Sequence, residues 1–592
     1  MADEKPEIKL PDPTEFAKNM VLITERSQKL VAEFVKRQKR RGGADPLNVG
    51  SAFIEMTARM LASPRRLIEA QLDLIKAYSE LWHHTAARMM GATPEPPIKP
   101  ERNDRRFRDA AWDESHIFDF VKQSYLLTAR WLQRTVRQVE GLDEATAKKV
   151  DFYTRQFVDA MAPSNFLLTN PEVLKTTLES NGENLVRGLE AMLQDLEDGE
   201  GTFAVKMTNM KSFRIGENIA TTPGKVVFRN RIFELLQFTP TTEKVYKRPL
   251  LIFPPWINKY YILDLREDNS FIRWMVARGY TVFVVSWVNP DENLAEVSFE
   301  DYLTEGIVAA TDAVCAATGE KELTAIGYCI GGTLLASALA YMTATGDKRI
   351  KAATFFASQV DFSEAGELMV FIDEEQLRHL EELMHARGYL DGRDMSNTFN
   401  MLRANDLIWS FVVNNYLLGR DPFPFDLLYW NADSTRMPAA MHSFYLRNMY
   451  QRNLLAKPGG LEMHGVPIDL GRVKIPIYLQ SAREDHIAPA RSVYKATSLF
   501  GGPVRFMMAG SGHIAGVVNP PHHKKYQHWI SEAKTLAPTV EQWLAEAKEI
   551  PGSWWEDWDR WLAPKSGPLV KARKPGGKLK PLCDAPGTYV RA

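Results

Sequence analysis

Three residues with nucleophilic or proton-transfer chemistry each follow a predicted strand in the second half of the chain. The first is Cys329, at the centre of the sequence GYCIG over residues 327–331, where a short apolar strand runs into a helix of small residues. A nucleophile at such an elbow is strained, needs small neighbours and stands exposed above the sheet. The dipole of the following helix favours a thiolate there. The pattern predicts acyl chemistry through thioesters; the alternative is a buried structural cysteine.

The partners that a cysteine nucleophile needs follow two later apolar segments, over residues 475–479 and 504–508. Asp485 comes after the first segment, and His513 comes after the second, 28 residues further along the chain. The order nucleophile, acid, histidine is that of α/β-hydrolases. We expect His513 to take the proton of the thiol. Asp485 would then hold the imidazole in one tautomer and balance its charge.

Two backbone N–H groups are also needed, to stabilise the oxyanion of the reaction. Ile330, directly after the nucleophile, supplies one, and we nominate Ile257, in the loop after an early strand, for the other. The neighbours of the acid leave alternatives open. Glu484 is a rival acid, although Asp485 lies deeper in the loop. His486 is a rival base, an entrance residue or an ordinary loop histidine.

The composition places these residues in a large and nearly neutral protein. The chain has 592 residues, with 73 Lys and Arg against 74 Asp and Glu, and is 45% hydrophobic. This length predicts more than one domain, and the balanced charge argues against nucleic acid as a partner. Three cysteines without metal-ligand spacing predict a reducing compartment and no metal site. We find no secretory signal and no apolar run of about 18 residues, which predicts no transmembrane segment.

The hydrophobic pattern predicts three regions. Residues 1–103 form a variable, partly flexible helical segment, and residues 104–200 form a more apolar helical domain. Over residues 201–592 short apolar strands alternate with helices, which is typical of a parallel sheet buried on both faces. The long stretch 362–455 predicts a cap inserted over the edge of the sheet where ligands bind. The predicted fold is therefore an α/β-hydrolase catalytic domain with an inserted cap, preceded by a helical N-terminal domain.

Several longer motifs resemble the polyhydroxyalkanoate synthases, class I in particular. The matching motifs are FPPWINKYYILDL over 253–265, GYCIGG over 327–332, RANDLIW over 403–409, PFDLLYWN over 424–431, REDHI over 483–487 and GSGHIAG over 510–516. The resemblance covers residues 105–592. It implies that Cys329 is the acylated nucleophile, His513 the base and Asp485 the acid. One departure is Val288, where the family usually has Arg before Asn-Pro-Asp.

The resemblance also implies an activity and a setting. The expected enzyme is an acyltransferase that polymerises (R)-3-hydroxyacyl-CoA, preferably with short chains such as 3-hydroxybutyryl, and releases CoA with no further cofactor. It is expected in the cytoplasm, at the surface of polyester granules, as a homodimer. Candidate substrate-binding residues are Asn258, Tyr416, Trp430 and His486. For most aromatic residues of the cap, packing in the cap core is the alternative.

Two other functions stay open from the sequence. A thioesterase or an intracellular polyester depolymerase would use the same triad and release free acid. A catalytically silent, granule-coating protein would use the amphipathic N-terminal helices and the Trp-rich segment 554–561, but the intact triad argues against it. The sequence also leaves open whether the chain stays on one Cys329, passes between subunits or leaves as a CoA ester.

Overall fold

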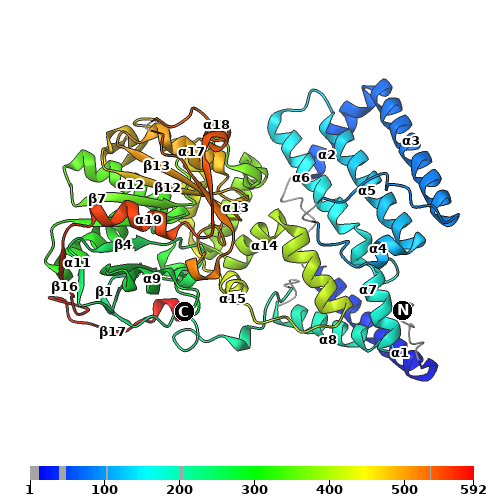
Figure 1. Ribbon diagram of the computed structural model, residues 1–592, viewed down its shortest axis with the longest axis horizontal. Coiled ribbons are helices and arrows are strands. Elements are labelled where there is room, and N and C mark those ends of the chain that lie inside the picture. Colours follow the sequence, from blue (N-terminus) through cyan, green and yellow to red (C-terminus); the bar gives the residue numbers. More distant parts are fainter. Residues whose placement is uncertain (1–11, 39–48, 102–103, 200–204, 534) are drawn as a thin grey trace. The chain divides into compact units, whose positions relative to one another are not determined.

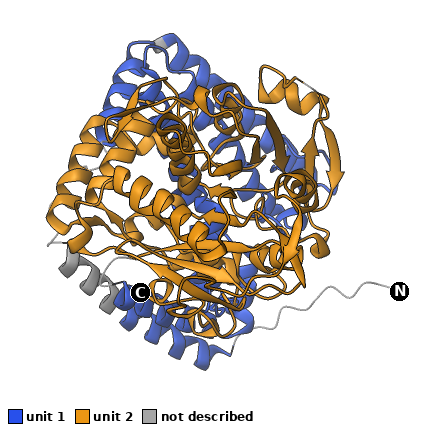
Figure 2. Ribbon diagram, turned by 90° about the vertical axis from the view of Figure 1, so that its left-hand side faces the viewer, with its two compact units in different colours: residues 1–209, 400–423 blue, residues 210–399, 424–592 orange. Residues whose placement is uncertain are grey.

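The computed structural model describes residues 12–38, 49–101, 104–199, 205–533 and 535–592 (Figure 1). The chain divides into two compact units (Figure 2). Unit 1 contains residues 1–209 and 400–423, and unit 2 contains residues 210–399 and 424–592. The predicted domain boundaries near residues 103 and 200 fall on residues outside the described ranges.

Unit 1 is helical. Its α-helices are α1 (Pro13–Gln38), α2 (Val49–Leu61), α3 (Pro64–Met89), α4 (Ala111–Glu114), α5 (His116–Arg137), α6 (Glu144–Ala160), α7 (Pro171–Glu179) and α8 (Glu183–Asp198). Residues 400–423 add the π-helical stretches η7 (Asn405–Trp409) and η8 (Val412–Leu417). Side chains that accept hydrogen bonds from first-turn N–H groups fix where several helices begin, namely Ser115 for α5, Asp143 for α6 and Asn170 for α7.

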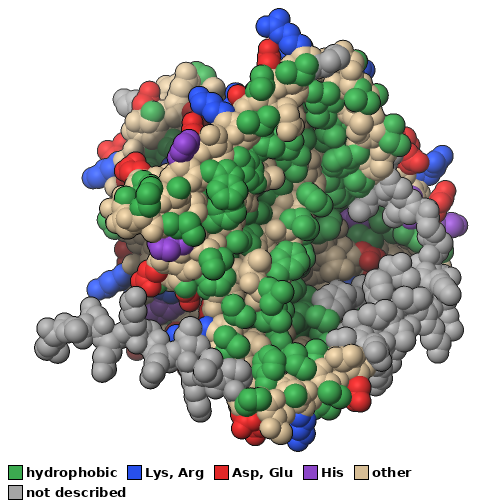
Figure 3. Space-filling view, turned by 90° about the vertical axis from the view of Figure 1, so that its right-hand side faces the viewer, with side chains coloured by type: hydrophobic (Ala, Val, Ile, Leu, Met, Phe, Trp, Pro, Cys, Tyr) green, Lys and Arg blue, Asp and Glu red, His purple; other side chains and the backbone are tan. Residues whose placement is uncertain are grey.

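The outward side of α3 is apolar. Its large hydrophobic side chains are each at least 57% exposed and recur at helical spacing: Ile68, Leu72, Ile75, Trp82 and Met89. Figure 3 shows hydrophobic side chains gathered on the face of the molecule that it presents. A different side of α3 packs on α5, around buried Leu81 and Leu127. Within the described ranges, none of the helices has the length and apolar character needed to cross a membrane.

Residues 400–423 pack within unit 1, whereas the prediction placed them in one cap over 362–455. The carbonyl oxygen of Tyr416 lies so close to Gly188 that a Cβ there would be 1.9 Å away from it. The Tyr416 hydroxyl donates to Asp195 Oδ2 at 2.6 Å. The structure differs from the prediction because this approach depends on a missing side chain 228 positions away, which the hydrophobic pattern does not reveal.

Unit 2 is built on an eleven-stranded sheet with the order β15-β14-β13-β12-β7-β6-β4-β5-β2-β1-β17. The six strands from β13 to β5 in this order are parallel, and the outer strands are antiparallel. The sheet strands are β1 (Gly224–Arg229), β2 (Phe233–Phe238), β4 (Leu250–Phe253), β5 (Val282–Trp287), β6 (Leu323–Tyr328), β7 (Ile350–Phe356), β12 (Ile477–Ala482), β13 (Val504–Ala509), β14 (Gln527–Ile530), β15 (Lys548–Pro551) and β17 (Cys583–Asp584).

Three short ribbons accompany the main sheet. They pair β3 (Lys244–Tyr246) with β16 (Leu569–Lys571), β8 (Tyr389–Leu390) with β9 (Met437–Pro438), and β10 (Leu461–Met463) with β11 (Val466–Ile468). The helices of unit 2 are α9 (Phe271–Ala277), α10 (Phe299–Asp301), α11 (Ala309–Thr318), α12 (Ile330–Thr345), α13 (Glu374–Arg387), α15 (Asp426–Ala432), α16 (Ala439–Tyr445), α17 (Ala490–Leu499), α18 (Val540–Glu546) and α19 (Trp555–Leu562). One more helix, α14 (Gly392–Leu402), spans the division between the units.

Helices cover both faces of the central sheet (Figure 1). Side chains alternate along β7, so Phe356 contacts Trp554 at 5.1 Å between ring centroids, while Phe355 faces the other way and contacts Phe500 at 5.3 Å. Three tryptophans of the Trp-rich segment, Trp554, Trp555 and Trp558, are at most 1% exposed. They belong to the core, which removes the Trp-rich segment as support for a granule-coating protein.

The predicted α/β-hydrolase fold is confirmed. Each of the six segments predicted as buried parallel strands overlaps one of the strands from β4 to β13 in the main sheet. The strands β14 and β15 at one end of the sheet and β17 at the other were not predicted. These strands have two to four residues and include polar or charged ones, so they lack the continuous apolar run that marks a central strand.

Candidate active site

The sharp turn between β6 and α12 holds Cys329 in a strained conformation, with φ 53° and ψ −125°. Two neighbouring glycines make the turn possible. A Cβ on Gly327 would lie 2.4 Å from the Cα of Gly332, and a Cβ on Gly331 would lie 2.3 Å from the carbonyl oxygen of Phe253. Such strain persists only where the surroundings enforce it, as at functional sites. The turn therefore has the geometry expected of a nucleophile elbow.

Two loops at the ends of neighbouring strands bring the acid and the histidine together. Asp485 follows β12 and His513 follows β13, and the distance from His513 Nδ1 to Asp485 Oδ2 is 2.7 Å. His513 also has a side-chain hydrogen bond with Cys329. The second carboxylate oxygen of Asp485 accepts the backbone N–H groups of Ile487 at 2.8 Å and Ala488 at 2.9 Å. These bonds fix the carboxylate, which in turn orients the imidazole.

The charges of the site favour a protonated imidazole. Burial by itself lowers the pKa of His513, but the charges of Asp485 and Cys329 and the hydrogen bonds with both raise the pKa well above its usual value. The raised pKa favours a proton on the imidazole, which lies between the side chains of Asp485 and Cys329. A thiolate is the nucleophilic form of cysteine.

The two rival residues next to Asp485, Glu484 and His486, do not line the cavity at Cys329. The Glu484 side chain is exposed, and it is the Asp485 carboxylate that reaches His513. His486 is half-buried and is not one of the described residues that line the cavity at Cys329, whereas its neighbour Ile487 does line it.

Cys329 opens into a small, mostly apolar cavity of about 50 Å³ within unit 2. Both residues nominated for the oxyanion, Ile257 and Ile330, lie in its wall. As the first residue of α12, Ile330 has an N–H with no intrahelical acceptor. The other residues of the wall come from α12, from the segments after β7, from α16 and the residues that follow it, and from the loop after β12: Thr333, Ala357, Gln359, Leu368, Ile372, Met395, Phe399, His442, Tyr445, Leu446, Tyr450 and Ile487.

Two of the predicted substrate-binding residues hold the loop that carries Ile257. Asn258 Nδ2 donates to the carbonyl of Trp430 at 3.2 Å, and Trp430 Nε1 donates to the carbonyl of Lys259 at 2.7 Å. The N–H of Thr435 donates to the carbonyl of Ile257 at 3.1 Å. Asn258 and Trp430 thus connect the loop to α15 and the residues after it, and neither of them lines the cavity. The fourth candidate, Tyr416, belongs to unit 1, where Asp195 accepts its hydroxyl.

Sequence reasoning did not single out several residues of the wall. Thr333 lies one helical turn after Cys329 and was detectable from that spacing. Gln359, His442 and Tyr450 carry no such signal, because their approach to the nucleophile depends on how distant segments pack.

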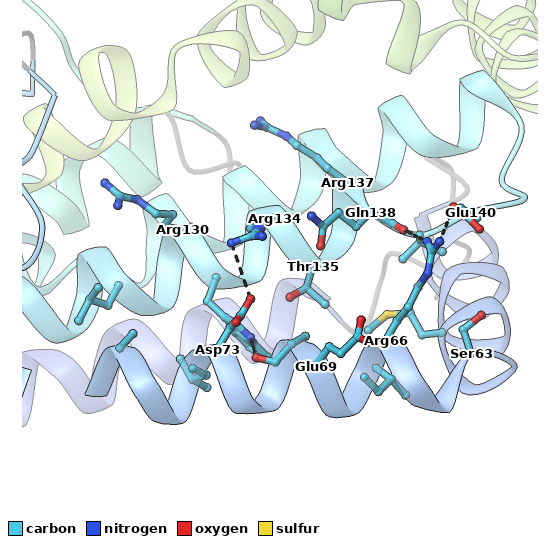
Figure 4. Close-up of a pocket in the computed structure, with 18 of the residues that line it drawn as sticks. Ser63, Arg66, Glu69, Asp73, Arg130, Arg134, Thr135, Arg137, Gln138 and Glu140 are labelled. Atoms are coloured by element: carbon cyan, nitrogen blue, oxygen red, sulfur yellow. Dashed lines mark hydrogen bonds and ion pairs between the residues drawn. The ribbon is translucent and has the colours of Figure 1, made fainter. Parts of the chain in front are cut away.

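A larger hollow lies in unit 1, between α2, α3 and α5, with a volume of about 770 Å³ (Figure 4). Two ion pairs join charged side chains of its lining: Arg134 lies 3.7 Å from Asp73, and Arg66 binds Glu140 and the carbonyl of Gln138. None of the described residues that line it is a cysteine or a histidine. The cavity at Cys329 is therefore the candidate active site.

Comparison with known proteins gives matches along nearly the whole chain. Residues 103–275 match the family model described as "Poly-beta-hydroxybutyrate polymerase (PhaC) N-terminus", and residues 256–520 match that of the alpha/beta hydrolase fold. The chain is 49% identical to the poly(3-hydroxyalkanoate) polymerase subunit PhaC of Rhizobium meliloti (strain 1021), over 98% of this chain and 95% of that protein. It is 53% identical to the poly(3-hydroxyalkanoate) polymerase of Methylorubrum extorquens, over 90% and 88% of the two chains.

Proposed function

The chain belongs to the poly(3-hydroxyalkanoate) polymerase family, and we propose from this premise that it joins (R)-3-hydroxyacyl groups through a covalent acyl-enzyme on Cys329. Membership of this family makes it an acyltransferase, as the sequence motifs predicted. The observation that supports the covalent step is the imidazole of His513, hydrogen-bonded to Asp485 on one side and to Cys329 on the other.

Acylation begins when the Cys329 thiolate attacks the carbonyl carbon of the CoA thioester. Negative charge develops on the carbonyl oxygen, where the N–H groups of Ile257 and Ile330 would stabilise it. The bond from carbon to the CoA sulfur then breaks, and the departing thiolate takes the proton of the His513 imidazolium. The acyl group is now on Cys329, and His513 is neutral.

Elongation uses the same imidazole as a base. The 3-hydroxyl of a second acyl group gives its proton to neutral His513, and its oxygen attacks the thioester carbon on Cys329. An ester bond forms, and Cys329 leaves as a thiolate beside the protonated imidazole. The Asp485 carboxylate stabilises that charge in both half-reactions.

The small volume of the cavity supports a synthase that prefers short acyl chains. A volume of about 50 Å³ holds roughly four water-sized groups, which suits a short chain such as 3-hydroxybutyryl. The apolar wall disfavours water near the acyl-enzyme, and exclusion of water separates polymerisation from hydrolysis. We further propose that the enzyme acts at the surface of polyester granules, because the exposed apolar side of α3 suits contact with an apolar surface. That it acts as a homodimer is proposed from the family resemblance.

The test supplies purified protein with (R)-3-hydroxybutyryl-CoA and follows free CoA and insoluble polymer by chromatography. We expect both products from the native protein and neither from Cys329→Ala. The matched control is Cys315→Ala, which removes a half-buried cysteine of α11 and should leave both products unchanged. Release of CoA with only 3-hydroxybutyrate would identify a thioesterase, and full activity of Cys329→Ala would refute the acyl-enzyme.

A further inference from the structure

A histidine in the wall of the cavity lacks a hydrogen-bond partner within the described part of the chain. His442 lies on α16, is 1% exposed and lines the same cavity as Cys329. Neither of its ring nitrogens has a hydrogen-bond partner among the residues that the structure describes. Buried polar groups in proteins are nearly always paired, so an exception needs an explanation.

The other polar side chains of the wall are already occupied. Thr333 Oγ1 donates to the carbonyl of Gln359 at 2.7 Å, and Gln359 Nε2 donates to a serine hydroxyl at 2.9 Å. The hydroxyls of Tyr445 and Tyr450 share a side-chain hydrogen bond. Among the described residues of this wall, His442 is thus the one whose buried side-chain nitrogens lack a hydrogen-bond partner and can meet a ligand.

The chemistry of His442 narrows the class of ligand. Burial lowers its pKa to about 4, so the ring is neutral at physiological pH and does not recognise a charge. A neutral imidazole offers one donor and one acceptor. A hydroxyl group can accept from the first or donate to the second, and fits this ring in either tautomer. Around it the cavity is apolar, which suits the carbon chain of an acyl group.

We propose that His442 recognises the 3-hydroxyl group of the acyl chain and so selects hydroxyacyl over plain acyl thioesters. This inference rests on the proposed function, because it concerns the acyl group that Cys329 receives. A ring nitrogen of His442 hydrogen-bonds the hydroxyl while Cys329 holds the carbonyl carbon. His442 is therefore a specificity-determining residue and not a member of the triad. The proton of the nucleophile is transferred to His513, not to His442.

The experiment compares single-turnover acylation, with enzyme in excess, by (R)-3-hydroxybutyryl-CoA and by butyryl-CoA, which lacks only the hydroxyl. The native protein should acylate faster with the hydroxy substrate, by roughly 10- to 100-fold, because butyryl-CoA leaves a buried hydrogen-bonding group unpaired. His442→Phe keeps the ring shape without hydrogen-bonding atoms, and should bring this ratio close to one by slowing the hydroxy substrate alone. His442→Gln, which retains a donor and an acceptor, should restore part of the ratio.

The matched control is His528→Phe. This histidine of β14 is also buried, at 3% exposure, but its Nδ1 faces the carbonyl of Gly552 and it does not line the cavity. The control should keep the native ratio. A native ratio in folded His442→Phe, an equal loss with both substrates, or a native ratio near one overturns the role of His442. If the native protein releases CoA from neither substrate, the proposed function itself fails.

A second measurement avoids the risk that His442→Phe does not fold. Cys329→Ala leaves the thioester intact, and its imidazole ¹⁵N resonances report hydrogen bonding directly. The His442 signal is assigned as the one missing from the His442→Gln variant. We expect it to shift on addition of (R)-3-hydroxybutyryl-CoA and to stay in place with butyryl-CoA. An equal response to both ligands, or to neither at saturation, contradicts the proposal.

Discussion

Each unit of the molecule buries a histidine against an aspartate, and the third partner decides what the pair does. In unit 1, His84 Nε2 lies 3.1 Å from Asp119 Oδ2, and Arg88 and Lys122 lie 2.5 Å and 3.3 Å from the same carboxylate. In unit 2, the third partner of the His513–Asp485 pair is Cys329. In unit 1, two cations neutralise the aspartate of the pair. In unit 2, the thiol of Cys329 adds a group that can react. A buried His–Asp pair is therefore no sign of catalysis until its next neighbour is known.

The largest difference between the two His–Asp pairs is expected in catalytic activity. Asp485→Asn leaves His513 without its orienting carboxylate, and CoA release should fall roughly 10²- to 10⁴-fold. The matched change in unit 1, Asp119→Asn, should leave the rate per folded molecule within about 2-fold, because that cluster contains no nucleophile. Its cost should be in stability, about 3–5 kcal/mol, because buried cations lose their counter-charge.

The two substitutions are compared by initial rates of CoA release, normalised to the folded fraction from circular dichroism. Equal losses of activity in both variants would break the comparison and would assign the clusters a common role.

The pH dependence of stability should also separate the two clusters. The folded-state pKa of His513 is raised, so its stabilising contribution is fully present below the unfolded pKa of about 6.5 and is lost as pH rises through the folded pKa. For Asp119, burial raises the pKa, but hydrogen bonds with His84 and Arg88 and the charge of Lys122 lower it overall. That contribution is present above about pH 4 and is lost as pH falls through the folded pKa.

Thermal unfolding between about pH 2 and pH 9 measures this difference. The gap in melting temperature between the native protein and Asp485→Asn should shrink toward high pH. The gap for Asp119→Asn should shrink toward low pH. Parallel curves for the two variants would contradict the assigned pKa directions.

A smaller effect, confined to unit 1, is expected for Tyr416→Phe. The change leaves the carboxylate of Asp195 without the hydroxyl that it accepts, at a cost of about 1–3 kcal/mol in the free energy of unfolding. The rate of CoA release per folded molecule should stay within about 2-fold of native, since the hydroxyl has a structural partner. A drop of tenfold or more at unchanged stability would restore Tyr416 as a substrate-binding residue.

The smallest effect on chemistry is expected on the outside of α3. Leu72→Glu with Ile75→Glu places two charges on an exposed apolar face and should leave CoA release unchanged, within about 2-fold. Retention on purified polyester granules should fall, because the apolar contact with the surface is weakened. The matched control is Asp73→Asn with Lys76→Gln, which changes neighbouring charged positions on the same helix. Native retention of the Leu72, Ile75 variant would exclude this face from granule binding.

Features that depend on neighbouring residues in the sequence were predictable, whereas features that depend on contacts between distant residues were not. The central strands and the elbow were predictable, because a buried parallel strand is a continuous apolar run and the elbow is made by consecutive residues around Cys329. The order of Asp485 and His513 was predictable because each follows its own strand. The short strands at the ends of the sheet, such as β15, were missed, and so was the place of residues 400–423, whose partners in unit 1 lie more than two hundred positions away.

By itself, the sequence determined the family, the fold and which cysteine, acid and histidine are candidates for the triad, since short motifs encode all of these. Only the tertiary structure decided which polar groups are satisfied. In the folded chain Asp195 accepts the Tyr416 hydroxyl, and Asn258 and Trp430 hold a loop. His442, in the cavity wall at Cys329, has no hydrogen-bond partner among the described residues. The physical reason is that a hydrogen bond depends on positions in space, and the chain brings its partners together only when it folds.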